Sequence, residues 1–159
     1  MARFRLEHRD KTYWVLGSMD EHADFSNVSF ASPPIRMNFR GLTAVNSIGV
    51  ARFTNFTDAW GVAKVEYLEC PLLWLDAMMM LPTLAGPEEN TARIVSMSCA
   101  FTCVTCGAKK EQLLDARAIT LKGEDVHFPT ATCDCGGLMR ADDAMQELIA
   151  LFEIGALGR

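Results

Sequence analysis

The sequence contains no long hydrophobic run. Its most apolar stretch, residues 71–84, is shorter than the ~18 residues that a membrane-spanning helix requires, and Asp76, Pro82 and Thr83 interrupt it. The N-terminal residues MARFRLEHRDK are charged throughout and lack the hydrophobic segment of a secretion signal. These two absences predict a cytoplasmic protein without a membrane span, in which thiols stay reduced.

An excess of positive charge is also missing. The chain has 159 residues, with 15 Lys and Arg against 20 Asp and Glu, and its net charge is −5 at pH 7. Residues 99–140, which hold most of the cysteines, contain five basic and five acidic residues. Binding to nucleic acid or to an anionic membrane is normally driven by clustered basic residues. The charge balance therefore argues against nucleic acid as a partner.

The usual catalytic motifs are absent as well. The three histidines, His8, His22 and His127, are widely separated and are expected at the surface or in loops. No Ser-His-Asp order, glycine-rich phosphate loop or pair of carboxylates on one helix face stands out. These absences predict a protein that is not an enzyme.

Half of the residues are hydrophobic, which is enough for one domain with its own hydrophobic core, with room for one small module. Residue periodicity predicts strands alternating with helices, which is typical of an α/β layer fold. The expected strands are residues 3–8, 12–17, 35–40, 63–69 and 93–101. The expected helices are residues 20–28, 46–61, 71–81 and 141–153, with a loop over residues 41–45.

Four of the six cysteines form two close pairs, Cys103-x-x-Cys106 and Cys133-x-Cys135. Structural zinc takes four tetrahedral ligands and prefers thiolates. Two short cysteine turns joined by a loop can supply this geometry, so the pattern predicts a structural Zn²⁺ site. The spacing is that of a zinc ribbon, except that ribbons usually have two residues between the second pair of cysteines.

Each pair is followed directly by a glycine, Gly107 or Gly136, where the backbone is expected to turn its N–H groups toward the sulfurs. Iron competes for the same ligands. A disulfide pair and four incidental thiols are further alternatives, and so is a redox centre that uses Cys103 and Cys106. The other two cysteines, Cys70 and Cys99, are expected in the core, because free cysteine packs as a small hydrophobe.

Two segments resemble the STAS domain of anti-sigma factor antagonists. In FRGLTAVNSIGVARF, residues 39–53, a strand leads through a Gly-Leu-Thr loop and a small polar pair into an amphipathic helix. In VEYLECPLLWLDAM, residues 65–78, a second strand leads into a helix packed alongside. The likeness covers about residues 3–100 and the last helix, and a branch with an inserted zinc ribbon is the nearest match.

The resemblance implies a bacterial, non-catalytic signalling domain that binds another protein of the anti-sigma or kinase type. Pairing of two copies is a further expectation. In the family, the domain switches between partners, and phosphorylation at the start of the helix after the loop often controls this switch. Here the usual position falls on Ile48, which cannot carry phosphate, and Asn46 replaces the usual acid. Asn46, Ser47 and Gly49 remain the candidate partner surface or phosphosite, and the alternative for Ser47 is a helix-capping hydroxyl.

The predicted organisation is thus a STAS-like sheet with helices packed on it and a small zinc-ribbon insert before the C-terminal helix. The boundaries place the STAS-like domain at residues 1–100 and the insert at residues 101–140. Residues 141–159 then return as a helix that packs on the STAS-like domain.

Overall fold

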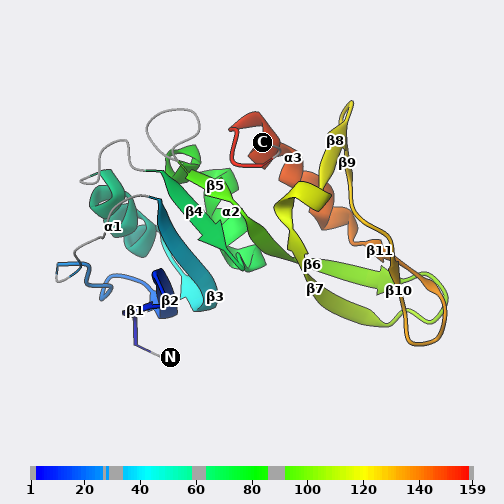
Figure 1. The fold of residues 1–159 in the computed structure, drawn as a ribbon, viewed down its shortest axis with the longest axis horizontal. Helices are drawn as coiled ribbons and strands as arrows, with labels where there is room; N and C mark the ends of the chain where they lie inside the picture. Colours follow the sequence, from blue (N-terminus) through cyan, green and yellow to red (C-terminus); the bar gives the residue numbers. More distant parts are fainter. Residues whose placement is uncertain (1–2, 27, 29–33, 59–63, 86–91, 158–159) are drawn as a thin grey trace.

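The computed structural model describes residues 3–26, 28, 34–58, 64–85 and 92–157, and it is a mixed α/β structure (Figure 1). The elements of the first part are β1 (Arg5–Arg9), β2 (Thr12–Met19), β3 (Ile35–Val45), α1 (Ser47–Asp58), β4 (Val65–Leu68), α2 (Leu72–Met80), η1 (Pro82–Ala85), β5 (Ala92–Ile94) and β6 (Ser96–Cys103). They continue with β7 (Lys109–Asp115), η2 (Ala116–Ala118), β8 (Thr120–Lys122), β9 (Asp125–His127), β10 (Ala131–Thr132), β11 (Leu138–Ala141), η3 (Asp143–Leu148) and α3 (Ile149–Glu153).

The first sheet has five strands in the order β1-β2-β3-β4-β5. β1 and β2 form an antiparallel hairpin, and the remaining neighbours are parallel. Parallel neighbours need crossover connections. The helix α1 lies in the connection from β3 to β4, and α2 lies in the connection from β4 to β5. At the far edge the Ile94 N–H donates to the Ala156 carbonyl over 2.9 Å, so the C-terminal segment covers β5.

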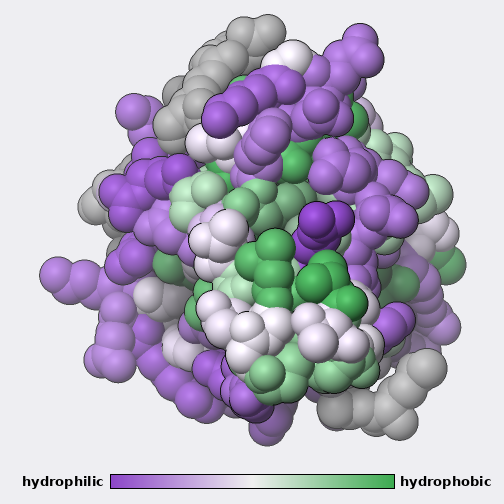
Figure 2. All heavy atoms as spheres, turned by 90° about the vertical axis from the view of Figure 1, so that its right-hand side faces the viewer, coloured by the Kyte–Doolittle hydropathy of each residue, from purple (hydrophilic) through white to green (hydrophobic). Residues whose placement is uncertain are grey.

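A second, antiparallel sheet of four strands has the order β10-β11-β6-β7. It forms the right-hand end of the molecule in Figure 1, and Figure 2 looks onto that end. The separate β8–β9 hairpin is tied to η3 by Gln146, whose side chain accepts from the Val126 N–H over 3.0 Å and donates to the Val126 carbonyl over 3.1 Å.

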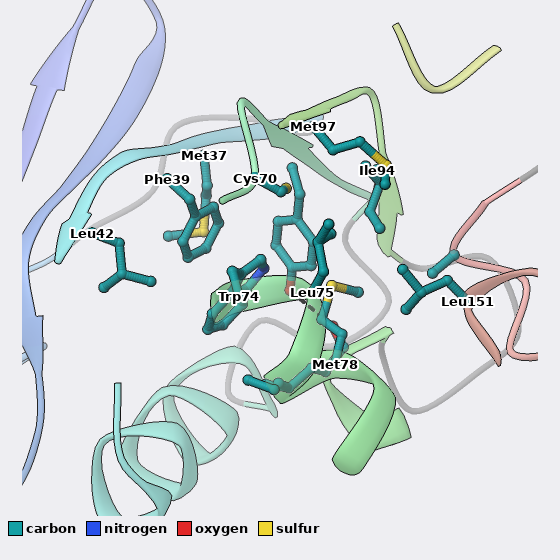
Figure 3. Packing of buried hydrophobic residues seen from close by; sticks show 14 of the residues in the cluster. Met37, Phe39, Leu42, Cys70, Trp74, Leu75, Met78, Ile94, Met97 and Leu151 are labelled. Atoms are coloured by element: carbon teal, nitrogen blue, oxygen red, sulfur yellow. Dashed lines mark hydrogen bonds between the residues drawn. The ribbon is translucent and has the colours of Figure 1, made fainter. Parts of the chain in front are cut away.

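Aromatic side chains fill the core under the first sheet (Figure 3). The ring of Phe39 on β3 stacks on Trp74 of α2, with centroids 4.2 Å apart, and meets Phe53 of α1 edge to face at 6.1 Å. One side chain of β3 thus contacts both helices, so α1 and α2 cover the same face of the sheet. Tyr67 of β4 completes the cluster and donates its hydroxyl to the Leu84 carbonyl over 2.9 Å.

Two predicted elements are wrong in type. Residues 20–26 do not form a helix, because the carboxylates of Asp20 and Asp24 accept from the N–H groups of His22 and Ser26 and hold turns instead. Residues 41–45 are not a loop, because β3 continues to Val45 in parallel pairing with β2. Backbone hydrogen bonds to a neighbouring strand outweigh the local preference of glycine for a turn.

Two further elements differ in extent. The single strand predicted for residues 93–101 divides at Val95 into β5 and β6, which belong to different sheets. The helix predicted for residues 141–153 begins only after β11, as a 3₁₀ segment that leads into the short α3. The predicted helix end at Gly61 lies outside the described residues. Within the part of the chain that the structure describes, none of the helices combines the length and apolarity needed to cross a lipid bilayer.

The helix α1 rests directly on the end of β2 at Gly49. A Cβ atom at this position would lie 2.0 Å from the Met19 carbonyl oxygen and 2.7 Å from the Asp20 nitrogen. We therefore predict that Gly49→Ala lowers the free energy of unfolding by at least about 2 kcal/mol, because backbone must move to admit the methyl group. Urea unfolding followed by circular dichroism measures this change.

The matched control is Ser47→Ala, which removes a polar atom from an exposed side chain on the same helical turn. Its effect on the free energy of unfolding is expected to stay within about 0.5 kcal/mol. If Gly49→Ala is as stable as the wild type, the close approach of β2 to α1 does not exist.

Candidate metal centre

The four paired cysteines lie on two turns that strand pairing brings together. Cys103 ends β6, so the Cys103–Cys106 pair lies in the turn to β7, and the Cys133–Cys135 pair lies in the turn from β10 to β11. β6 and β11 are neighbours, with Cys103 opposite Met139. The expectation that the four thiols meet is confirmed, although the second pair has one intervening residue.

The four sulfurs lie close enough together to hold one metal ion. All four Sγ atoms lie within 4.8 Å of one another. Across the two turns, Cys103 Sγ is 3.6 Å from Cys135 Sγ, and Cys106 Sγ is 3.7 Å from Cys133 Sγ. Four sulfurs at the usual Zn–S length would be about 3.8 Å apart. A disulfide needs about 2.05 Å, so all four cysteines are free thiols in this structure.

Glycine is required after each pair because of its backbone conformation. Gly107 and Gly136 have φ angles of 71° and 81°, in the left-handed region, and a Cβ at either would meet no atom within 4 Å. Their N–H groups donate to the carbonyls of Cys103 and Cys133, over 3.0 Å and 2.9 Å. The backbone N–H groups that turn toward the sulfurs, as expected for these turns, therefore belong to neighbouring residues.

Other amides face the sulfurs. The N–H groups of Cys106 and Thr105 lower the pKa of the Cys103 thiol to about 6, because hydrogen bonds to sulfur favour the thiolate. Cys103 is also the buried member of the set, whereas Cys106 and Cys135 are exposed. The site therefore has one side held in the protein and one side open to solvent.

The Cys135 thiol resists ionisation beside Cys103. The Gly137 N–H lowers the pKa of Cys135, but contacts with Cys106, Cys103 and Cys133 raise it more, to about 12. Negative charge on one sulfur disfavours charge on its neighbours. A bound cation would remove this repulsion, so the cluster suits a metal ion better than four free thiolates.

Sequence reasoning missed Gly137. Its Cβ would lie 2.5 Å from Thr105 Oγ1, 2.8 Å from Thr105 Cβ and 2.9 Å from Cys103 Sγ. The second turn thus packs its backbone against the first at this residue. The signal for Gly137 in the sequence was the second glycine of the Gly-Gly pair after Cys135, because the positive φ of the turn requires only the first, Gly136.

Apolar side chains border the two turns. Val104 is 57% exposed and Leu138 is 43% exposed, and the Val104 N–H donates to the Leu138 carbonyl over 3.0 Å. Figure 2 shows hydrophobic side chains gathered on this end of the molecule. The turns are therefore flanked by apolar groups rather than by a charged patch.

The other two cysteines are core residues, as expected. Cys70 and Cys99 are both 0% exposed. Burial raises the pKa of Cys70, and it raises the pKa of Cys99 to about 12. Both thiols are therefore unreactive in the folded protein.

The start of α1 has a different arrangement from the expected one. Asn46 holds the cap position, since its Oδ1 accepts from the Gly49 N–H over 2.8 Å. Its Nδ2 donates to Glu21 Oε2 over 2.9 Å. Ser47 is the first residue of the helix and is exposed, so the capping role considered for its hydroxyl belongs to Asn46. Gly49 is buried, and the backbone that approaches it belongs to the chain itself.

Comparison of the chain with protein-family models, with curated proteins and with solved structures finds no match.

We predict that Gly137→Ala weakens metal binding by about tenfold or more. The added methyl group would push Thr105 and Cys103 Sγ apart from the second turn. Competition with a chromophoric chelator for Zn²⁺ or Co²⁺ measures the affinity.

The control for backbone strain is Gly123→Ala in the β8–β9 turn. Gly123 has a φ of 65°, and a Cβ there would meet no atom within 4 Å. This variant should lose stability but keep its metal affinity. Unchanged metal affinity in Gly137→Ala would mean that the two turns do not touch at this glycine.

Proposed function

We propose that this protein is a non-catalytic bacterial protein-binding domain of STAS type, stabilised by a structural zinc ion on Cys103, Cys106, Cys133 and Cys135. The observation that carries the zinc assignment is the clustering of the four sulfurs, which all lie within 4.8 Å of one another. Four thiolate ligands fill the coordination sphere of zinc and leave no position for water or substrate. Such a site supplies folding energy rather than catalysis.

The STAS assignment is supported by the order of elements in the segments that carry the resemblance. Residues 39–53 contain the end of β3 and the start of α1, and residues 65–78 contain β4 and most of α2. The exposed residues Asn46, Ser47 and Ile48 at the start of α1 offer a surface to a regulatory partner. The partner class, an anti-sigma or kinase-type protein, follows from the resemblance alone.

One observation favours a second function, a thiol-based redox enzyme or sensor. The N–H groups of Cys106 and Thr105 lower the pKa of Cys103 to about 6, and Cys106 beside it is exposed. A low pKa and solvent access are the properties of a reactive cysteine pair. In that function Cys103 and Cys106 would act without a metal ion.

Metal analysis of the protein purified without chelator separates the two functions. We expect one zinc ion per chain, with thiols that react slowly until a chelator is added. Cys103→Ser/Cys135→Ser should lose zinc, and β7, β10 and β11 should unfold before the five-stranded sheet, because metal binding and folding of such turns are one event.

The control is Cys99→Ala, which removes a buried thiol away from the site and should keep its zinc. Stoichiometric zinc in the double serine variant would show that the ligands are assigned wrongly. A metal-free protein with a fast-reacting thiol would establish the redox function instead.

The start of α1 is tested by charge. Ser47→Glu should fold normally, since a carboxylate suits the positive end of a helix dipole. It should weaken partner binding far more than Ser47→Ala, because an apolar or acidic partner group would have to desolvate or repel the new charge. Calorimetry with the partner captured from native cells measures both affinities. Equal affinities for wild type, Ser47→Ala and Ser47→Glu would place the partner surface elsewhere.

A further inference from the structure

Strand β7 forms an uncovered edge of the second sheet. It is the terminal strand in the order β10-β11-β6-β7, and none of the strands that the structure describes pairs with it on the side away from β6. Its seven residues, KKEQLLD, are exposed or half-buried, and Leu113 is 52% exposed. A free edge of this length presents unpaired N–H and C=O groups, which favours pairing with another strand.

The pairing of β7 with β6 fixes which residues present these groups. The Cys103 N–H donates to the Ala108 carbonyl, and the Ala116 N–H donates to the Val95 carbonyl, both over 2.9 Å. In an antiparallel pair the direction of the backbone groups alternates along each strand. The even-numbered residues of β7 therefore bond to β6. The N–H and C=O groups of the odd-numbered residues point outward, and these residues are Lys109, Glu111, Leu113 and Asp115.

Three antiparallel registers pair at least three of these outward residues of one copy with those of a second copy around a two-fold axis within the strand. An axis at Lys110 sets Lys109 opposite Glu111 but pairs only these two residues, and an axis at Leu114 pairs only Leu113 and Asp115. An axis at Glu111 sets two glutamates opposite each other. An axis at Leu113 sets Glu111 opposite Asp115. An axis at Gln112 sets Lys109 opposite Asp115 and Glu111 opposite Leu113, and it uses all four outward residues. Since opposite charges across strands stabilise and like charges destabilise, the register at Gln112 is the favoured one.

We propose that two copies of this chain associate through antiparallel pairing of β7 with β7, with Gln112 on the two-fold axis. The charges of the strand complement themselves in this register, which identifies a second copy, rather than a strand of another protein, as the occupant. The contact is isologous, so it closes at a dimer. The opposite edge of the sheet does not extend it, because β10 is only two residues long. This inference is independent of the proposed function.

Charge variants of the full chain, loaded with zinc, test the register by sedimentation equilibrium over a wide range of concentrations. We expect the wild type to form dimers as concentration rises. Lys109→Asp should weaken the dimer by about tenfold or more, because two symmetric pairs change from attraction to repulsion. The matched control is Lys110→Asp, which makes the same change of charge opposite the uncharged Leu114 and should change the dimer constant less than threefold, or about 0.6 kcal/mol.

Mixing two variants restores the complementarity. Asp115→Lys alone sets two lysines opposite each other, whereas a mixture of Lys109→Asp with Asp115→Lys pairs aspartate with lysine at both ends. The mixture should form heterodimers with nearly wild-type affinity. Because Asp115 also binds Arg117, circular dichroism must first show that Asp115→Lys folds. If Asp115→Lys does not fold, the comparison of Lys109→Asp with Lys110→Asp alone tests the proposed register.

Three outcomes would overturn the proposal. The first is a wild type that stays monomeric throughout. The second is equal dimer constants for Lys109→Asp and Lys110→Asp. The third is a mixture of folded variants that associates no better than either alone.

Discussion

The pairing of β6 with β11 is the interaction on which the candidate metal centre depends. Neither cysteine turn is close to the other in sequence, and each supplies only two sulfurs. Cys103 lies opposite Met139, and the Val104 N–H donates to the Leu138 carbonyl, so the two turns meet at the same end of the sheet. A slip of this register by one residue would point the side chains to opposite faces and separate the sulfurs.

The sequence predicted the two cysteine turns and the position of α1 well, because both depend on local chemistry. Each close cysteine pair places two thiols on one tight turn, and Asn46 specifies a helix start through its own side chain. Pairing between distant segments was not predictable in the same way. Residues 41–45 became strand because β2 lies beside them. Val95 separates β5 from β6 because the two strands find partners in different sheets.

The glycines show the same division between local and distant causes. Gly107 and Gly136 are needed for positive φ in their own turns, so their position after a cysteine pair was informative. Gly49 and Gly137 are needed because another part of the chain passes too close for a Cβ atom. Sequence alone cannot reveal that second reason, since the neighbouring backbone at Met19 and the neighbouring turn at Thr105 become adjacent only in the fold.

Strand β6 joins the core to the metal centre. Alternate residues of a strand face the same side, and Met97, Cys99 and Phe101 all point into the core. Cys103 continues this row and is 2% exposed, so the side of the strand that packs against apolar residues also delivers the first sulfur. A metal ion there would fix the end of a core strand as well as two turns. Metal binding and packing of the second sheet are thus coupled through one strand, and the exposed Cys106 and Cys135 form the side from which a metal ion would enter.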